Sequence, residues 1–244
     1  MTDDIGDVAA LVGATGGAGT TRLTVELGAL LASDGRAVAI LDAAFATQGL
    51  SDYLSGRIDP DLTALLTDER EAPLQEGLLE FPLDTDAGRM ACLPAFAPFE
   101  RLARAKSPAA AQVFESRIDA AAAAFDHVLV DTPPVAANQS VAAVNAADRI
   151  ALVAPATTHG RDAVQRMDGR LADIGVEADA VVSTRGELSV ADATLPETDI
   201  DAPACLSEQP TASATADVAA AVFDIALSPE ETGLFGSIGE FVSR

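Results

Sequence analysis

The stretch VAALVGATGGAGTT at residues 8–21 decides the fold of this 244-residue chain. Residues 8–12 form a short apolar run, residues 13–19 are rich in glycine, and residues 20–32 carry apolar side chains at helical spacing. A strand, a glycine-rich turn and a helix in that order stack backbone N–H groups at a helix amino terminus, where they bind anions. The sequence therefore predicts a phosphate-binding loop.

The side chains of this loop predict a cradle with little positive charge. A phosphate loop ordinarily carries a lysine just before its metal-binding hydroxyl, and here that position is Thr20. The hydroxyl of Thr21 remains and is expected to bind Mg²⁺. The residues expected to surround a phosphate are Gly16, Gly17, Ala18, Gly19, Thr20 and Thr21.

Apolar runs of about four residues alternate with helical stretches along the rest of the chain, which implies a mostly parallel sheet with helices on both faces. We expect one doubly wound α/β domain over residues 1–228 and a separate tail over residues 229–244. The expected later strands are 38–41, 90–93, 128–130, 150–153 and 180–182. The expected helices are short ones within 50–66, then 109–125, 141–147, 161–174 and 214–227.

Two aspartates follow apolar strands at positions where ligands bind in parallel sheets. Asp42 ends the second expected strand, and Asp131 ends the run HVLV before Thr132-Pro133-Pro134. Ligands of open parallel sheets bind at the carboxyl ends of the strands, so both carboxylates should lie beside the phosphate loop. We expect Thr21, Asp42 and Asp131 to hold Mg²⁺, since this cation prefers oxygen ligands.

The composition is strongly acidic and disfavours binding to DNA. The net charge is −23, the pI is about 4.1, and Lys106 is the single lysine among 15 basic residues. This composition resembles that of salt-in haloarchaeal proteins, and an ordinary acidic cytosolic protein is the alternative. In molar salt the Debye length falls to about 3 Å, so long-range attraction to phosphate would be weak, and the surface has the wrong sign for it.

The remaining composition favours a protein of the cytoplasm. Cys92 and Cys205 form no CxxC pair, which fits a reducing compartment. The amino terminus MTDDIGD lacks the basic and apolar regions of a signal peptide, and no apolar stretch reaches the length of a membrane span. His127 and His159 are isolated from other metal-binding residue types, and we expect structural or surface roles for them.

The ordered set of motifs resembles the ParA/MinD family of deviant-Walker P-loop ATPases, over residues 8–227. The loop at 15–21 aligns with the family's KGGxGKT, and Asp131-Thr132-Pro133-Pro134, Leu93-Pro94-Ala95 and Ala154-Pro155 before Arg161-Asp162 match family patterns. The resemblance implies the P-loop NTPase fold and an ATP-dependent dimer that positions chromosomes, plasmids, septa or other cargo. It also implies binding to DNA or membrane in the ATP state, with release when a partner triggers hydrolysis.

The chain departs from this family where the family does its chemistry. Thr15 replaces a lysine that in the family reaches across the dimer to the phosphates of the other subunit, and Thr20 replaces the lysine of the phosphate loop itself. Ala44 replaces an aspartate that helps orient the attacking water. No catalytic residue of the family is therefore intact at positions 15, 20 and 44. Asp162 matches the partner of the lysine missing at 15, and Ser183-Thr184 replaces a base-binding asparagine. We expect neither Arg22 nor Arg161 to substitute for the lysines.

The tail after Pro229 carries one apolar helical face. In relatives of the MinD type such a tail binds the bilayer, but here Glu230, Glu231 and Glu240 accompany it, against only Arg244. Membrane, a protein partner and the chain's own domain are open alternatives for its contact. The face consists of Leu234, Phe235, Ile238, Phe241 and Val242.

These observations together predict a cytoplasmic ParA/MinD-like protein of spatial organisation. Peripheral contact of its tail with the inner face of the membrane is one of the alternatives left open. Its ATP and Mg²⁺ binding should be weak and its hydrolysis impaired, so that it acts as a scaffold or regulator, as a homodimer or as a heterodimer with a relative. One alternative is a working ATP-dependent switch with other phosphate ligands. Another is a loop that binds a smaller phosphorylated ligand.

Overall fold

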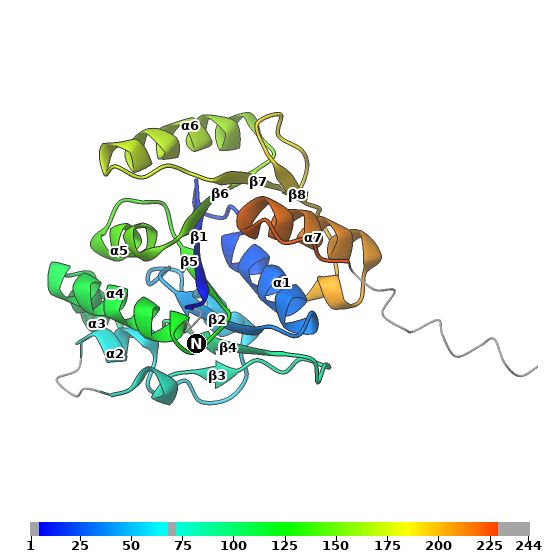
Figure 1. The fold of residues 1–244 in the computed structure, drawn as a ribbon. Helices are drawn as coiled ribbons and strands as arrows, with labels where there is room; N and C mark the ends of the chain where they lie inside the picture. Colours follow the sequence, from blue (N-terminus) through cyan, green and yellow to red (C-terminus); the bar gives the residue numbers. More distant parts are fainter. Residues whose placement is uncertain (1–4, 68–71, 229–244) are drawn as a thin grey trace, which may run out of the picture.

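The computed structural model describes residues 5–67 and 72–228 (Figure 1). The tail residues that the sequence singled out, Leu234, Phe235, Ile238, Phe241 and Val242, lie outside the described residues. Their role and the division between a domain and a tail remain predictions.

One eight-stranded sheet forms the centre of the molecule, in the order β3-β4-β2-β5-β1-β6-β7-β8. Every pair of neighbouring strands is parallel except β3 and β4, which are antiparallel. The expected doubly wound, mostly parallel sheet is thus confirmed. The strands are β1 Asp7–Gly13, β2 Ala37–Asp42, β3 Leu79–Glu80, β4 Arg89–Leu93, β5 His127–Thr132, β6 Arg149–Pro155, β7 Ala180–Thr184 and β8 Ala193–Leu195.

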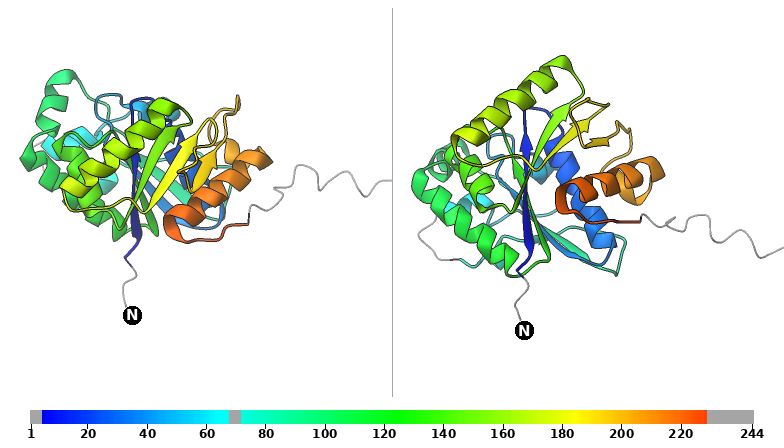
Figure 2. Two further views of the ribbon diagram at one scale, coloured as in Figure 1. Left: turned by 90° about the horizontal axis from the view of Figure 1, so that it is seen from above. Right: turned by 45° about the horizontal axis from the view of Figure 1, so that its top comes forward.

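Helices cover both faces of this sheet (Figures 1 and 2). On one face α1 packs against α7, and the other helices lie on the opposite face, where α4 packs against α5. The α-helices are α1 Thr20–Ser33, α2 Leu62–Thr67, α3 Phe99–Ala105, α4 Pro108–Ala122, α5 Asn138–Ala146, α6 Thr158–Asp173 and α7 Gln209–Phe223. The described residues also form three 3₁₀ turns, η1 Gly49–Tyr53, η2 Leu74–Glu76 and η3 Ala204–Leu206.

The central strand β1 shows why the strands of this sheet consist of consecutive apolar residues. Ala9 and Leu11 belong to the core beneath α1 and α7, whereas Val8 and Val12 belong to the cores on the other face. Successive side chains of a strand point to opposite faces, and because both faces are covered, every position must be apolar.

Several predicted boundaries were wrong. The closing helix begins at Gln209 and ends at Phe223, rather than spanning 214–227, and Asp224 just after it adopts φ 57°, a left-handed conformation that ends a helix. The helix predicted at 109–125 stops at Ala122. The short elements α3, β3 and β8 were not predicted, because seven, two and three residues carry too little periodicity.

The two cysteines and the two histidines lie in different surroundings. Cys92 and Cys205 are buried, and neither forms a disulfide. His127 is buried against the ring of Phe223, with ring centroids 4.8 Å apart, and this burial lowers its pKa, as does the nearby Arg36. His159 is exposed. Among the described helices, none combines the length and the apolarity that crossing a bilayer requires.

Candidate functional site

The loop between β1 and α1 has the backbone shape of an anion cradle. Gly17 and Gly19 adopt φ values of 71° and 88°, a region that residues with a Cβ rarely enter. Gly19 is also the residue that caps α1, and its cap involves no side-chain hydrogen bond in the described chain. The first N–H groups of α1 therefore face the loop without a side-chain acceptor, which favours binding of an anion.

The two threonines at the lysine positions bring no charge to this cradle. A Cβ built on Gly13 would come within 2.8 Å of Thr20 Oγ1, so the Thr20 side chain folds back against the start of the loop. Thr15 is half-buried at the loop's opening turn. The cradle therefore offers backbone N–H groups and hydroxyls, but no ammonium group at either position.

The oxygen groups expected to hold Mg²⁺ lie together at the carboxyl ends of β1, β2 and β5. The Thr21 hydroxyl donates a hydrogen bond of 2.6 Å to Asp131 Oδ2. Asp42 is the direct neighbour of Asp131 in the parallel register of β2 and β5, and both side chains are buried. This set of hydroxyl and carboxylate oxygens fits Mg²⁺, which would complete its shell with water and phosphate oxygens. The described residues contain no cluster of three or more His, Cys, Asp or Glu side chains suited to a metal.

Burial makes the two carboxylates costly to ionise together. Burial raises the pKa of Asp42, the negative charge of Asp131 raises it further, and the backbone N–H groups of Ala44 and Ala95 partly oppose this at 2.8 and 3.3 Å. Burial also raises the pKa of Asp131, and the hydrogen bond from Thr21 opposes the rise. A cation beside the pair would lower both pKa values.

Replacing Asp42 with Asn should therefore remove a pH-dependent loss of stability. A raised pKa in the folded state means that the contribution of Asp42 is fully present below the usual carboxyl pKa of about 4 and is lost as the pH rises through the raised value. Without divalent cations, the free energy of unfolding of the wild type should fall more steeply with pH than that of Asp42→Asn, by up to about 1.4 kcal/mol per pH unit. Urea unfolding between about pH 5 and pH 9 with a chelator measures the difference. Equal slopes would contradict the raised pKa, and Mg²⁺ should stabilise only the wild type.

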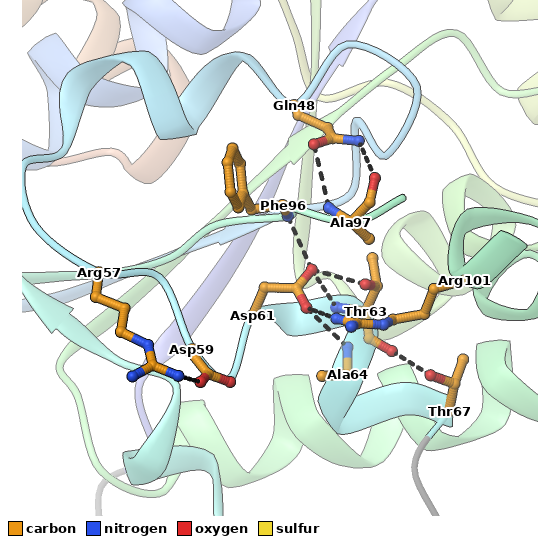
Figure 3. Close-up of polar contacts among 10 residues, drawn as sticks. All are labelled: Gln48, Arg57, Asp59, Asp61, Thr63, Ala64, Thr67, Phe96, Ala97 and Arg101. Atoms are coloured by element: carbon orange, nitrogen blue, oxygen red, sulfur yellow. Dashed lines mark hydrogen bonds and ion pairs between the residues drawn. The ribbon is translucent and has the colours of Figure 1, made fainter. Parts of the chain in front are cut away.

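A buried network around Asp61 (Figure 3) holds the segment that follows β4. Asp61 Oδ2 accepts hydrogen bonds from Thr63 Oγ1 at 2.6 Å and from the Phe96 N–H at 2.8 Å, and Arg101 pairs with Oδ1 at 2.7 Å. Phe96 directly follows Ala95, whose N–H donates to Asp42. The network thereby ties the amino terminus of α2 and the helix α3 to the end of β4, next to the carboxylate pair.

Two side chains reach the loop from the end of β7, and the sequence did not predict their contacts with it. Thr184 Oγ1 donates to the Ala18 carbonyl at 2.7 Å, and the guanidinium of Arg185 donates to the Gly17 carbonyl at 2.6 Å. Both residues line a pocket of about 220 Å³ that also includes Arg22 and the segment 195–198. The missed signal was Arg185 itself, the basic residue immediately after the pair that replaces the family's asparagine.

The other residues from the sequence analysis lie as follows. Arg22 bonds to Glu26 Oε1 at 3.2 Å and to the Ile200 carbonyl at 2.6 Å, so its guanidinium points away from the loop, as expected. Arg161 and Asp162 are exposed at the start of α6. Ala44 is buried beside Asp42 and has no group that would orient water.

Comparison with known proteins identifies the architecture. No protein-family model matches the sequence, and no curated protein sequence matches it. Among solved structures, the MinC:MinD cell division protein complex of Aquifex aeolicus matches with a TM-score of 0.68 and 23% identity, over 87% of this chain and 93% of that one. The chain has the ParA/MinD fold. The ParA/MinD fold expected from the sequence motifs is thereby confirmed.

Two further structures with the ParA/MinD fold match over most of their length. The septum site-determining protein MinD from Pyrococcus horikoshii, complexed with Mg-ADP, is 19% identical with a TM-score of 0.64, over 79% of this chain and 82% of that one. A ParA family ATPase from Chlorobium tepidum is 14% identical with a TM-score of 0.65, over 87% and 91%. In this ParA/MinD fold, the loop, Asp42 and Asp131 occupy the carboxyl ends of β1, β2 and β5.

Proposed function

We propose that the chain is a ParA/MinD-type protein of intracellular spatial organisation that binds ATP weakly, hydrolyses it poorly, and acts as a scaffold or regulator. One observation carries this proposal: the loop keeps its backbone cradle and its Thr21–Asp131 contact, while positions 15, 20 and 44 have lost the charged side chains. The backbone geometry that would hold a nucleotide with Mg²⁺ is therefore present. The side chains that would neutralise its phosphates and orient the attacking water are absent at positions 15, 20 and 44.

The expected loss of ATP affinity follows from the two missing positive charges. A hydrogen bond to a charged group contributes about 1.5–3 kcal/mol, so the absence of two lysines weakens ATP binding by about two to four orders of magnitude. The loss in the transition state is larger, because negative charge on the transferred phosphoryl group is neutralised less and Ala44 cannot orient the water. Hydrolysis should therefore suffer more than binding.

The neighbours support the cofactor and partner parts of this proposal. One of them is a complex with Mg-ADP and another is a complex of MinD with MinC. By analogy we propose ATP and Mg²⁺ as weakly bound ligands, with Mg²⁺ held by Thr21, Asp42 and Asp131. We further propose a homodimer or a heterodimer with a ParA/MinD relative in the cytoplasm, without direct binding to DNA. The tail after residue 228 would supply any contact with the membrane.

A working ATP-dependent switch is the second candidate, and the contact between Arg185 and the loop favours it. A steady-state ATPase assay in molar KCl with Mg²⁺ separates the two candidates. The first proposal expects turnover indistinguishable between the wild type and Asp131→Ala. Turnover that Asp131→Ala abolishes would favour the switch and overturn the proposed impairment.

The role in spatial organisation has its own test in the cell. A fluorescently tagged chain, expressed at its native level, should concentrate at discrete positions such as the septum or a cargo. A variant lacking residues 230–244 separates the contribution of the tail from that of the domain. A uniform distribution of the full chain throughout growth and division would contradict the proposed role.

A further inference from the structure

Among residues 5–67 and 72–228, Arg185 is the cationic side chain that hydrogen-bonds to the phosphate loop. Its Nη2 donates to the carbonyl of Gly17, a glycine in the middle of the loop, at 2.6 Å. Within the described chain it forms no ion pair, and its side chain is exposed, so the remaining guanidinium N–H groups are available to a ligand.

The other arginines near the loop do not match this geometry. Arg22 lines the same pocket but is paired with the fully buried carboxylate of Glu26 and bound to the carbonyl of Ile200. Arg161, at the start of α6, is exposed, and its side chain forms no hydrogen bond or ion pair with the loop in the part of the chain that the structure describes. Arg185 thus brings its positive charge to the loop from the end of β7, whereas residues 20–22 lie at the start of α1.

The backbone of Arg185 is held in a conformation that arginine rarely adopts. Its φ of 60° lies in the left-handed region, and its N–H bonds to the carbonyl of Leu195 at 3.0 Å. The hydroxyl of Thr184 fastens the same corner to Ala18. Backbone strain of this kind persists where surrounding contacts enforce it, and such places are enriched in ligand-binding sites.

We infer that Arg185 is a phosphate-binding residue that supplies, from the end of β7, part of the positive charge missing at positions 15 and 20. Its ligand is a phosphoryl group of a nucleoside di- or triphosphate bound in the loop. Guanidinium groups bind phosphate oxygens through two parallel N–H donors, and the fork of Arg185 has donors beyond the one that Gly17 uses. This inference rests on the proposed function in assuming that the loop still takes a nucleotide, and it identifies what holds the phosphates there.

Calorimetric titration with Mg-ATP, with Mg-pyrophosphate and with adenosine in molar KCl tests the inference. Arg185→Asn removes the charge while keeping a residue type that tolerates the left-handed region, and Arg161→Asn removes an equal charge from an exposed site. Arg185→Asn should weaken binding of Mg-ATP and of pyrophosphate by at least about tenfold, while adenosine binding stays unchanged. Arg185→Lys should recover part of the loss. The melting temperature of Arg185→Asn should equal or exceed that of the wild type, which shows that lost binding is not lost folding.

The outcomes separate this inference from the proposed function. Unchanged affinity in Arg185→Asn, or an equal loss in Arg161→Asn, overturns the role of Arg185 and leaves the impaired scaffold standing. Absence of binding of either phosphate compound to the wild type also overturns it. Conversely, Asp131-dependent turnover in the wild type, with weakened binding in Arg185→Asn, overturns the proposed impairment and supports the inference.

Discussion

Placing lysine at positions 15 and 20 together should tighten binding of Mg-ATP by about two to four orders of magnitude. Both positions lie on a loop whose backbone already has the shape of a phosphate cradle, with Gly17 and Gly19 in the left-handed region. The substitutions therefore add charge to a formed site and need no rearrangement of the backbone. Calorimetric titration of the double variant and the wild type in molar KCl measures the change.

The control for this prediction is the double variant with glutamine at positions 15 and 20. Glutamine adds length and hydrogen-bonding capacity without a charge, so its affinity for Mg-ATP should stay near that of the wild type. If both double variants bind equally well, shape and not charge limits the site. If the lysine variant binds no better than the wild type, the missing lysines do not explain weak binding.

Replacing Asp61 with Ala should lower the free energy of unfolding by about 3–5 kcal/mol. Asp61 is almost fully buried, and its removal leaves Arg101 without its carboxylate and the Thr63 hydroxyl and Phe96 N–H without their acceptor. For a chain of this length the melting temperature should fall by about 10 °C. Urea and thermal unfolding measure both quantities.

Glu80→Ala provides the matched control for Asp61. Glu80 pairs with Arg89 at 3.4 Å, but both side chains are at least half exposed. Exposed ion pairs contribute about 0–1 kcal/mol, so this variant should melt close to the wild type. Comparable losses from the two substitutions would show that Asp61 is not a specific anchor of the loop after β4.

The sequence was sufficient to predict the loop and the two aspartates because their signals are local. An apolar run that ends in glycines or in an aspartate marks both a buried strand and the point where that strand leaves the sheet. Thr21, Asp42 and Asp131 are far apart in the chain, yet parallel strands bring their carboxyl ends to one edge, where the structure places all three. The parallel topology thus brings three residues that the sequence marks separately to one edge of the sheet.

The contact of Arg185 with the loop was not predictable in the same way. The contact joins residues 168 positions apart, and it depends on a left-handed backbone conformation that an arginine in the sequence does not predict. The Asp61 network is similar, since its acceptor and its donors Phe96 and Arg101 come from three separate segments. Such contacts arise from the packing of loops against one another, for which a single sequence has no periodic signal.

The sheet begins with the two-residue strand β3 and finishes with the three-residue strand β8. Each edge of the sheet therefore presents only a few backbone N–H and C=O groups with which a strand of another molecule can pair. These short edge strands disfavour fibril-like stacking through backbone hydrogen bonds, and the strong negative charge of the chain opposes it further. Contacts between copies of this chain are therefore expected to use side-chain surfaces rather than a backbone ladder shared between two sheets.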